Sequence, residues 1–202
     1  MRQVRILLWV LVALALIGAG ALLLLRREPP ELPQLAAKPV AIGGPFVLTD
    51  VDGRTVPSSR LAGRPYAIFF GFTHCPDVCP TTLARIVRLR RQLEAVGEPL
   101  QIVFVTVDPE RDSPAELKRY LALFEDPIVG LTGTAAQIDQ AKRQFGIYSA
   151  KVPDKSGGYT VDHTATVLLF DRDGRFVSTI SPEEGDPVAL EKLKRISAPA
   201  AA

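Results

Sequence analysis

The stretch Tyr66-Ala-Ile-Phe-Phe-Gly-Phe-Thr-His-Cys-Pro-Asp-Val-Cys-Pro80 begins with an unbroken apolar run and ends in two cysteines separated by three residues. A short run of this kind, rich in aromatic residues, is typical of a strand that is buried on both faces of a sheet. From Thr81 to Val96, apolar residues then recur at helical spacing, which predicts a helix. The stretch therefore predicts a strand, a cysteine-bearing loop and a helix in succession.

Strands and helices continue to alternate after this helix. Gln101–Val107 is a second short apolar run, and Ser113-Pro-Ala-Glu116 places a capping serine and a first-turn proline at the start of a helix. Thr134 with Gln137 repeats the capping pattern before a helix that we expect to end at Gly146. The chain therefore belongs to the α/β class.

Two hairpins, a short strand and a last helix complete the pattern. Each hairpin is predicted by an Asp-Gly turn between two short apolar segments, with Phe46–Thr49 and Arg54–Val56 around Asp52-Gly53, and Thr166–Phe170 and Phe176–Ile180 around Asp173-Gly174. Ile147–Val152 can form a short strand, and Asp186-Pro187 opens a helix that ends near Ile196. This order suits a thioredoxin-like fold, which has a central mixed sheet flanked by helices and, here, an N-terminal hairpin.

The N-terminus carries an uncharged apolar segment, Ile6–Leu25, that is long enough to cross a bilayer. A cleaved signal peptide is the alternative, because Ala19-Gly-Ala21 would suit a cleavage site. The apolar run continues past those residues to Leu25, which favours an uncleaved anchor. The arginine pairs on its two flanks are equal in number and leave the orientation open.

We therefore expect four parts along the chain. Residues 1–25 form a membrane anchor, 26–43 a proline-rich linker, 44–197 the thioredoxin-like domain, and 198–202 a disordered tail. Arg2 and Arg5 are the only charged residues of the anchor, so the other 22 basic residues match the 22 acidic ones. A neutral soluble part gives no electrostatic reason to expect a nucleic-acid partner.

Cys75 and Cys79 are the only cysteines in the chain, too few and too close together for a disulfide scaffold. They follow the carboxyl end of a predicted strand and precede a helix, where α/β folds place their sites. The positive end of that helix is expected to lower the cysteine pKa values. Two such thiolates suit either redox exchange or a soft metal, and an inert core disulfide is the structural alternative.

A third ligand would have to come from His74 or His163, the only histidines. His74 adjoins Cys75 and is expected to point away from it, in a structural role. His163 lies in a predicted loop just before the Thr166–Phe170 strand. Two thiolates and an imidazole would accept Cu(I), Cu(II) or zinc.

Three separated motifs resemble the Sco/SenC family. They are Gly71-Phe-Thr-His-Cys-Pro-Asp-Val-Cys-Pro80, Val105-Thr-Val-Asp-Pro-Glu-Arg-Asp112 and Tyr159-Thr-Val-Asp-His-Thr164. The resemblance covers roughly residues 44–196 and implies a thioredoxin-like copper chaperone for cytochrome c oxidase assembly. It implies that Cys75, Cys79 and His163 bind Cu(I) or Cu(II), whereas His74 and Asp77 are not direct ligands. Asp108-Pro109 also matches a family signature, which we interpret as a structural turn.

The resemblance further implies partners and a location. The partners are the copper-site subunit of cytochrome c oxidase, other copper chaperones and a thiol reductant. No Arg- and Ser-rich presequence precedes the apolar segment, so we expect a single-pass protein of the bacterial cytoplasmic membrane with its domain in the periplasm.

Two other functions stay open. One is a membrane-anchored thiol-disulfide oxidoreductase that reduces partner cysteines, with Cys75 and Cys79 as its redox pair. Its cysteines would be separated by three residues, however, whereas those of thioredoxin are separated by two. The other is a copper-responsive signalling domain. Whether the protein is an enzyme is thus undecided, with a non-catalytic carrier favoured. Four arginines crowd the helix after the cysteines and suit either an acidic partner or a solvated face: Arg85, Arg88, Arg90 and Arg91.

Overall fold

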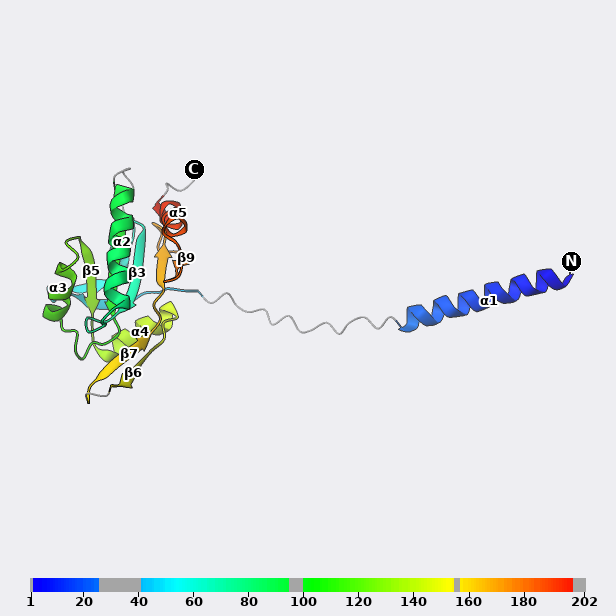
Figure 1. The fold of residues 1–202 in the computed structure, drawn as a ribbon, viewed down its shortest axis with the longest axis horizontal. Coiled ribbons are helices and arrows are strands. Elements are labelled where there is room, and N and C mark those ends of the chain that lie inside the picture. The colour runs from blue at the N-terminus through cyan, green and yellow to red at the C-terminus, as the bar shows by residue number, and fades with distance from the viewer. Residues whose placement is uncertain (1, 26–40, 95–99, 155–156, 198–202) are drawn as a thin grey trace. The chain divides into compact units, whose positions relative to one another are not determined.

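The computed structural model describes residues 2–25, 41–94, 100–154 and 157–197, which belong to two compact units (Figure 1). The first unit covers residues 1–40 and the second residues 41–202. Most of the predicted linker at 26–43 and all of the predicted tail at 198–202 lie outside the described residues. The boundaries of the four parts expected from the sequence stay predictions.

The first unit is a single described helix, α1, which spans Arg2–Leu25. Within it, Arg2–Ala21 has a mean hydropathy of 2.3 and is long and apolar enough to cross a membrane. At roughly 1.5 Å per residue, such a helix matches a hydrocarbon core about 30 Å thick. The predicted N-terminal apolar helix is therefore confirmed as a helix.

The second unit is built on a seven-stranded sheet with the order β2-β1-β5-β4-β3-β8-β9 (Figure 1). Its strands are β1 Val47–Asp50, β2 Thr55–Pro57, β3 Tyr66–Gly71, β4 Gln101–Thr106, β5 Ile128–Thr132, β8 Val167–Phe170 and β9 Phe176–Ile180. The central strands β3, β4 and β5 run parallel, and all the other pairs are antiparallel. The mixed sheet and both Asp-Gly hairpins are confirmed.

Strand β5 was not predicted from the sequence. It is short, it follows Pro127 directly, and Gly130 interrupts its apolar residues. A Cβ atom on Gly130 would lie 2.3 Å from Leu121 Cδ1, so glycine is required by the close packing of helix α3 (Pro114–Ala122) on this strand. Gly130, which weakens the strand pattern in the sequence, is therefore explained by its packing against helix α3.

The described helices of this unit are α2 Val78–Glu94, α3 Pro114–Ala122, α4 Ala135–Phe145 and α5 Asp186–Ser197, with a short 3-10 turn, η1, at Ser58–Leu61. Their predicted caps are confirmed. Ser113 accepts a hydrogen bond from the Glu116 N–H at 3.2 Å, and Thr134 forms a reciprocal capping box with Gln137. Gly146 ends α4 in the left-handed conformation at φ 67°.

Helix α2 begins at Val78, three residues before the predicted start at Thr81. Pro80 does not prevent this, because the N–H groups of a first turn have no partner within their own helix. The Thr81 N–H closes the first turn by donating to the Asp77 carbonyl at 3.1 Å. Cys79 therefore lies in the helix itself and not in the loop before it.

Strands β3 and β4 form the centre of the core, since all six residues of each are buried. Successive residues of a strand point to opposite faces, so both faces of the sheet are covered. Helix α3 packs on β5 and α4 on β1, whereas α5 packs on β8, β9 and α2. The predicted central sheet flanked by helices is confirmed.

Strands β6 (Ser149–Pro153) and β7 (Tyr159–His163) form a separate two-stranded ribbon next to α4 (Figure 1). The strand expected at Ile147–Val152 is present, shifted by one to two residues. The prediction that His163 lies in a loop was wrong, because it is the last residue of β7 and pairs with Ser149. Strand pairing gives it a defined place that a loop would not.

The arginine-rich face of α2 is engaged within the chain. Arg85 and Arg88 both form ion pairs with Asp186 at the start of α5. Arg90 and Arg91 pair with Asp126 in the connection between α3 and β5. These arginines therefore join α2 to its neighbours within the chain. The sequence alone suggests only an acidic partner or a solvated helix face.

Candidate metal centre

The loop between β3 and α2 is held at its start by a buried carboxylate. Asp112, which is 0% exposed, accepts hydrogen bonds from the Thr73 N–H at 3.0 Å and the Thr73 hydroxyl at 2.6 Å. It also accepts one from the hydroxyl of Thr106, the last residue of β4, at 2.6 Å. Charge-assisted hydrogen bonds of this kind are the strong ones, so the loop leaves the sheet in one defined direction.

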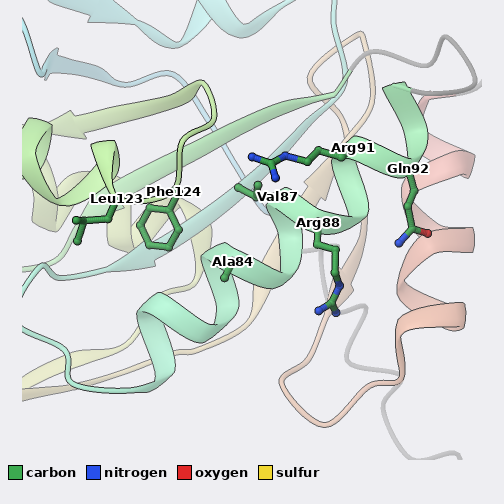
Figure 2. Close-up of a pocket in the computed structure, with 7 residues that line it drawn as sticks. All are labelled: Ala84, Val87, Arg88, Arg91, Gln92, Leu123 and Phe124. Carbon is green, nitrogen blue, oxygen red and sulfur yellow. The ribbon is translucent and has the colours of Figure 1, made fainter.

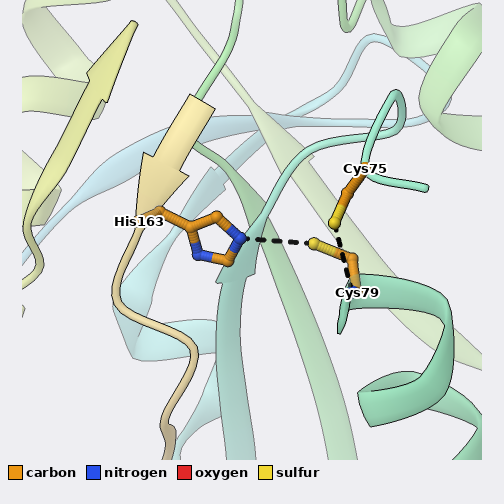
Figure 3. Close-up of side chains that lie close together, drawn as sticks. All are labelled: Cys75, Cys79 and His163. Atoms are coloured by element: carbon orange, nitrogen blue, oxygen red, sulfur yellow. Dashed lines mark hydrogen bonds between the residues drawn. The ribbon is translucent and has the colours of Figure 1, made fainter. Parts of the chain in front are cut away.

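Both cysteines are free thiols, and they face each other across the first turn of α2 (Figure 3). The Cys79 N–H donates to Cys75 Sγ at 3.4 Å. Cys79 is completely buried at 0% exposure, whereas Cys75 is half-buried. The pair thus has one sulfur inside the domain and one at its edge.

His163 reaches the same point from the end of β7 (Figure 3). Its Nε2 atom lies 3.4 Å from Cys79 Sγ, and its Nδ1 atom lies 2.9 Å from the Thr164 carbonyl oxygen. A carbonyl only accepts, so Nδ1 carries the proton in this contact. In the neutral ring, Nε2 then directs its lone pair at Cys79 Sγ, where it accepts from the thiol and could instead bind a metal.

The three donor atoms of Cys75, Cys79 and His163 all lie within 4.8 Å of one another. Thiolate and imidazole ligands sit about 2.0–2.3 Å from an ion, so two ligands of one ion are at most about 4.6 Å apart. The observed spacing is on that scale and needs only a small contraction. The other histidine, His74, lies outside this cluster, with a half-exposed ring whose Nδ1 is 3.0 Å from Thr73 Oγ1.

Burial keeps two of the three donors, Cys79 and His163, uncharged. It raises the pKa of the Cys79 thiol well above its ordinary value, and the neighbouring Cys75 adds to this. The lower pKa expected from the helix N-terminus is therefore wrong for Cys79, because loss of solvation outweighs the helix dipole. Burial also lowers the pKa of His163, which keeps the ring neutral.

Aromatic rings enclose the histidine. The ring of Phe72 stands edge-on to the imidazole with 5.7 Å between centroids, and Phe69 lies at 6.0 Å. Both phenylalanines are buried. The site is therefore dry on its inner side, which strengthens electrostatic interactions with any bound cation.

A cavity of about 570 Å³ lies elsewhere, between α2 and the end of α3 (Figure 2). It is lined by Ala84, Val87, Arg88, Arg91, Gln92, Leu123 and Phe124. None of these side chains is a thiol, carboxylate or imidazole. Its lining therefore offers no donors for a soft metal, and the candidate metal centre is the separate cysteine and histidine cluster.

Residues 35–198 match the family described as SCO1/SenC. The chain belongs to the SCO1/SenC family. It is 40% identical over 196 residues to the mitochondrial SCO2 homologue of Bos taurus, a match that covers 92% of this chain and 74% of the relative. The resemblance inferred from the three sequence motifs is thereby confirmed.

Solved structures of the SCO1/SenC family share this fold. The copper-bound structure of ScoI from Bradyrhizobium japonicum is 47% identical, with a TM-score of 0.70, and the match covers 77% of this chain and 99% of that one. BsSco, described as having a disulfide switch and as a member of the Sco family of cytochrome c oxidase assembly proteins, is 26% identical, with a TM-score of 0.63 and coverages of 79% and 96%. The predicted thioredoxin-like fold is confirmed.

Two residues that support the site were not singled out from the sequence. Asp112 ends the quoted Val105–Asp112 motif, yet its hydrogen bonds to Thr73 cross 39 positions of the chain. Gly71 ends β3, and a Cβ atom there would lie 2.8 Å from Cys79 Sγ. Only the motif itself, with its unusual density of charges and turn residues, pointed to Asp112.

The difference in burial between the two thiols predicts different reactivity. In the native, reduced, metal-free protein, iodoacetamide should modify Cys75 at least about tenfold faster than Cys79, because burial hides the second sulfur and keeps it protonated. Rates measured by mass spectrometry on Cys75→Ser and Cys79→Ser variants would separate the thiols. If Cys75 and Cys79 of the folded protein were modified at equal rates, and as fast as in denaturant, the burial of Cys79 would be contradicted.

Gly71 predicts a second effect. Gly71→Ala places a methyl group against Cys79 Sγ and the Phe104 ring, so we expect it to lower the free energy of unfolding by about 1–3 kcal/mol and to weaken metal binding. Gly185→Ala is the matched control, because its nearest neighbour would be 3.8 Å away. Chemical denaturation and metal titration of both variants test this, and identical behaviour would remove the proposed close contact.

Proposed function

We propose that this protein is a copper carrier that holds one copper ion between Cys75 Sγ, Cys79 Sγ and His163 Nε2 and delivers it to the copper site of cytochrome c oxidase. The observation that carries the proposal is the convergence of two thiols and one imidazole within 4.8 Å. The copper-bound relative from Bradyrhizobium japonicum supports the choice of metal. The assembly role described for BsSco supports the choice of recipient.

The donor set suits copper in either oxidation state. Soft thiolates favour Cu(I), and an imidazole nitrogen helps to satisfy Cu(II). With two thiolates and a neutral His163, the site would have a net charge of about −1 with Cu(I) and about 0 with Cu(II). Asp77, at the entrance to α2, would favour the more positive ion.

The unequal burial of the two cysteines determines the side from which a recipient could take the copper ion. Cys79 holds the inner side of the ion, whereas Cys75 and His163 are both half-buried, and Cys75 lies beside the exposed residues His74 and Pro76. A recipient with competing soft ligands would therefore approach at Cys75 and displace that sulfur first. The same edge would admit copper from other copper chaperones.

Copper binding requires both thiols to be reduced. In an oxidising compartment, Cys75 and Cys79 would form a disulfide, which offers no thiolate to the ion. A dithiol partner would restore the site by giving two electrons and two protons to this disulfide and becoming a disulfide itself. A thiol reductant is therefore the third partner that the proposal includes.

A thiol-disulfide oxidoreductase is the second candidate function. It is favoured by half-buried Cys75, whose sulfur accepts the Cys79 N–H at a helix N-terminus. In this function, Cys75 would attack a partner disulfide and Cys79 would resolve the mixed disulfide. His163 would then not be needed as a ligand.

We further infer that α1 anchors the protein as a single pass in a bacterial cytoplasmic membrane, with the domain in the periplasm. The length and apolar composition of Arg2–Ala21 support the anchor. A periplasmic position suits a redox-active pair of cysteines, and it would place the domain beside the oxidase.

His163→Ala tests the carrier function against the oxidoreductase. We expect the variant, reduced in the full-length protein, to lose Cu(II) affinity by on the order of 100-fold while its rate of disulfide exchange stays unchanged. The measurements are competition titrations with a chelator and a disulfide-exchange assay. His74→Ala is the matched control and should keep both properties, because its ring lies outside the cluster.

Two outcomes would count against copper carriage. One is an unchanged copper affinity in His163→Ala. The other is tight copper binding by wild-type protein whose Cys75–Cys79 disulfide is demonstrably intact, since the thiolates would then not be ligands. Normal copper binding in His163→Ala together with rapid disulfide exchange would favour the oxidoreductase, which does not need His163 as a ligand.

The proposed location predicts the access of a protease to the domain. In spheroplasts of a bacterium expressing the full chain, added protease should digest the domain and leave a short anchored fragment, because the domain lies outside the cytoplasmic membrane. Inverted vesicles should protect it. Digestion in the inverted vesicles alone would place the domain in the cytoplasm, and release of the intact protein from membranes by a salt wash would exclude an anchor.

A further inference from the structure

The ribbon of β6 and β7 carries His163 at one end of β7. Tyr159, the first residue of β7, contacts the rest of the domain. The Tyr159 hydroxyl donates to Asp108 Oδ1 at 2.9 Å. Arg111 donates to Asp108 Oδ2 and, from Nη1, to the Tyr159 carbonyl at 2.9 Å. Its guanidinium carbon also lies 3.8 Å from the centre of the Tyr159 ring. We call these three residues, Asp108, Arg111 and Tyr159, the clamp.

The clamp is partly buried, unlike the ion pair between Lys151 of β6 and Glu110. The Asp108 side chain is 0% exposed and that of Arg111 is 25% exposed. By contrast, Lys151 and Glu110 are 47% and 65% exposed, and an exposed pair of this kind contributes little to stability. A buried carboxylate that accepts two donors with good geometry fixes its partners more firmly.

The ribbon depends on such a link. An isolated two-stranded ribbon is only marginally stable in water, and much of β6 is exposed. Tyr159, Val161 and His163 occupy alternate positions of β7, so their side chains lie on the same face of the strand. Holding Tyr159 therefore also fixes the twist and position at which the imidazole emerges.

A second route connects the clamp to the histidine. The Arg111 guanidinium carbon lies 5.8 Å from the centre of the Phe72 ring. Phe72 in turn stands edge-on to His163, with an interplanar angle of 89°. Arg111 thus packs against the ring that packs against the imidazole, in addition to holding the strand.

We propose that the clamp is a positioning device for the His163 ligand and that it sets how strongly the site prefers Cu(II) over Cu(I). The proposal rests on the copper-carrier function. Cu(I) can be held by the two thiolates alone, whereas Cu(II) prefers more ligands in a fixed geometry that includes nitrogen. Loosening the histidine therefore weakens Cu(II) binding more than Cu(I) binding.

Tyr159→Phe tests this in the full-length, detergent-solubilised protein, because it removes only the oxygen that donates to Asp108. We expect a loss of Cu(II) affinity of about 10–100-fold, the usual effect of removing a residue that orients a metal ligand, and a change in Cu(I) affinity below about threefold. The electron paramagnetic resonance spectrum of the Cu(II) form should also change. Tyr148→Phe is the matched control, since Tyr148 is 60% exposed, and it should behave as wild type.

A measurement without metal keeps the test independent of copper binding. In the metal-free protein, amide hydrogen exchange in β7 should be faster in Tyr159→Phe than in wild type or Tyr148→Phe, while exchange in β3 and β4 should stay unchanged. Arg111→Lys, which keeps the charge but loses the two-pronged contact, should shift exchange and Cu(II) affinity in the same direction.

The outcomes separate the clamp from the function on which it rests. Wild-type copper affinities and unchanged β7 exchange in Tyr159→Phe would overturn the clamp and leave the copper carrier standing. Equal losses for Cu(I) and Cu(II) would overturn it too, because they indicate general damage to the site. Failure of the wild-type protein to bind either ion would overturn the proposed function and the role of the clamp in copper preference together.

Discussion

The candidate metal site depends on one long-range contact. His163 Nε2 and Cys79 Sγ lie 3.4 Å apart, although 84 positions of the chain separate the two residues. The β3 strand brings the cysteines to the carboxyl end of the sheet, and β7 brings the imidazole to the same place from outside it. Neither element alone offers a useful metal site. The shared geometry arises only when the sheet and the ribbon take up fixed relative positions.

Two buried carboxylates in the segment between β4 and α3 hold the sheet and the ribbon in these relative positions. Asp112 holds the start of the cysteine loop through Thr73, and Asp108 holds the ribbon through Tyr159. Both belong to the segment between β4 and α3, so a single loop controls both halves of the site. Buried charges are costly unless they are paired and hydrogen-bonded, and here the hydrogen bonds that compensate them are also those that place the ligands.

The protonation states of Cys79 and His163 favour the binding of a cation at the candidate site. Burial raises the pKa of Cys79 and lowers that of His163, so in the absence of an ion these two candidate ligands are a neutral thiol and a neutral imidazole. A soft cation replaces the thiol proton and supplies the positive charge that stabilises the buried thiolate. Cys75, at the edge, leaves one side of the site open for exchange with another protein.

The sequence by itself determined the alternation of strands and helices, both Asp-Gly hairpins, the helix caps and the cysteine pair, because these signals are local or periodic. It also singled out His163 as a candidate ligand, through the family motifs, and the structure brings its ring to the cysteines. Only the tertiary structure decided that β5 exists, that Cys79 lies inside α2 with a raised pKa, and that Asp108 reaches Tyr159 across 51 positions. These features follow from close packing, burial and contacts between distant segments, which leave no periodic pattern in the chain.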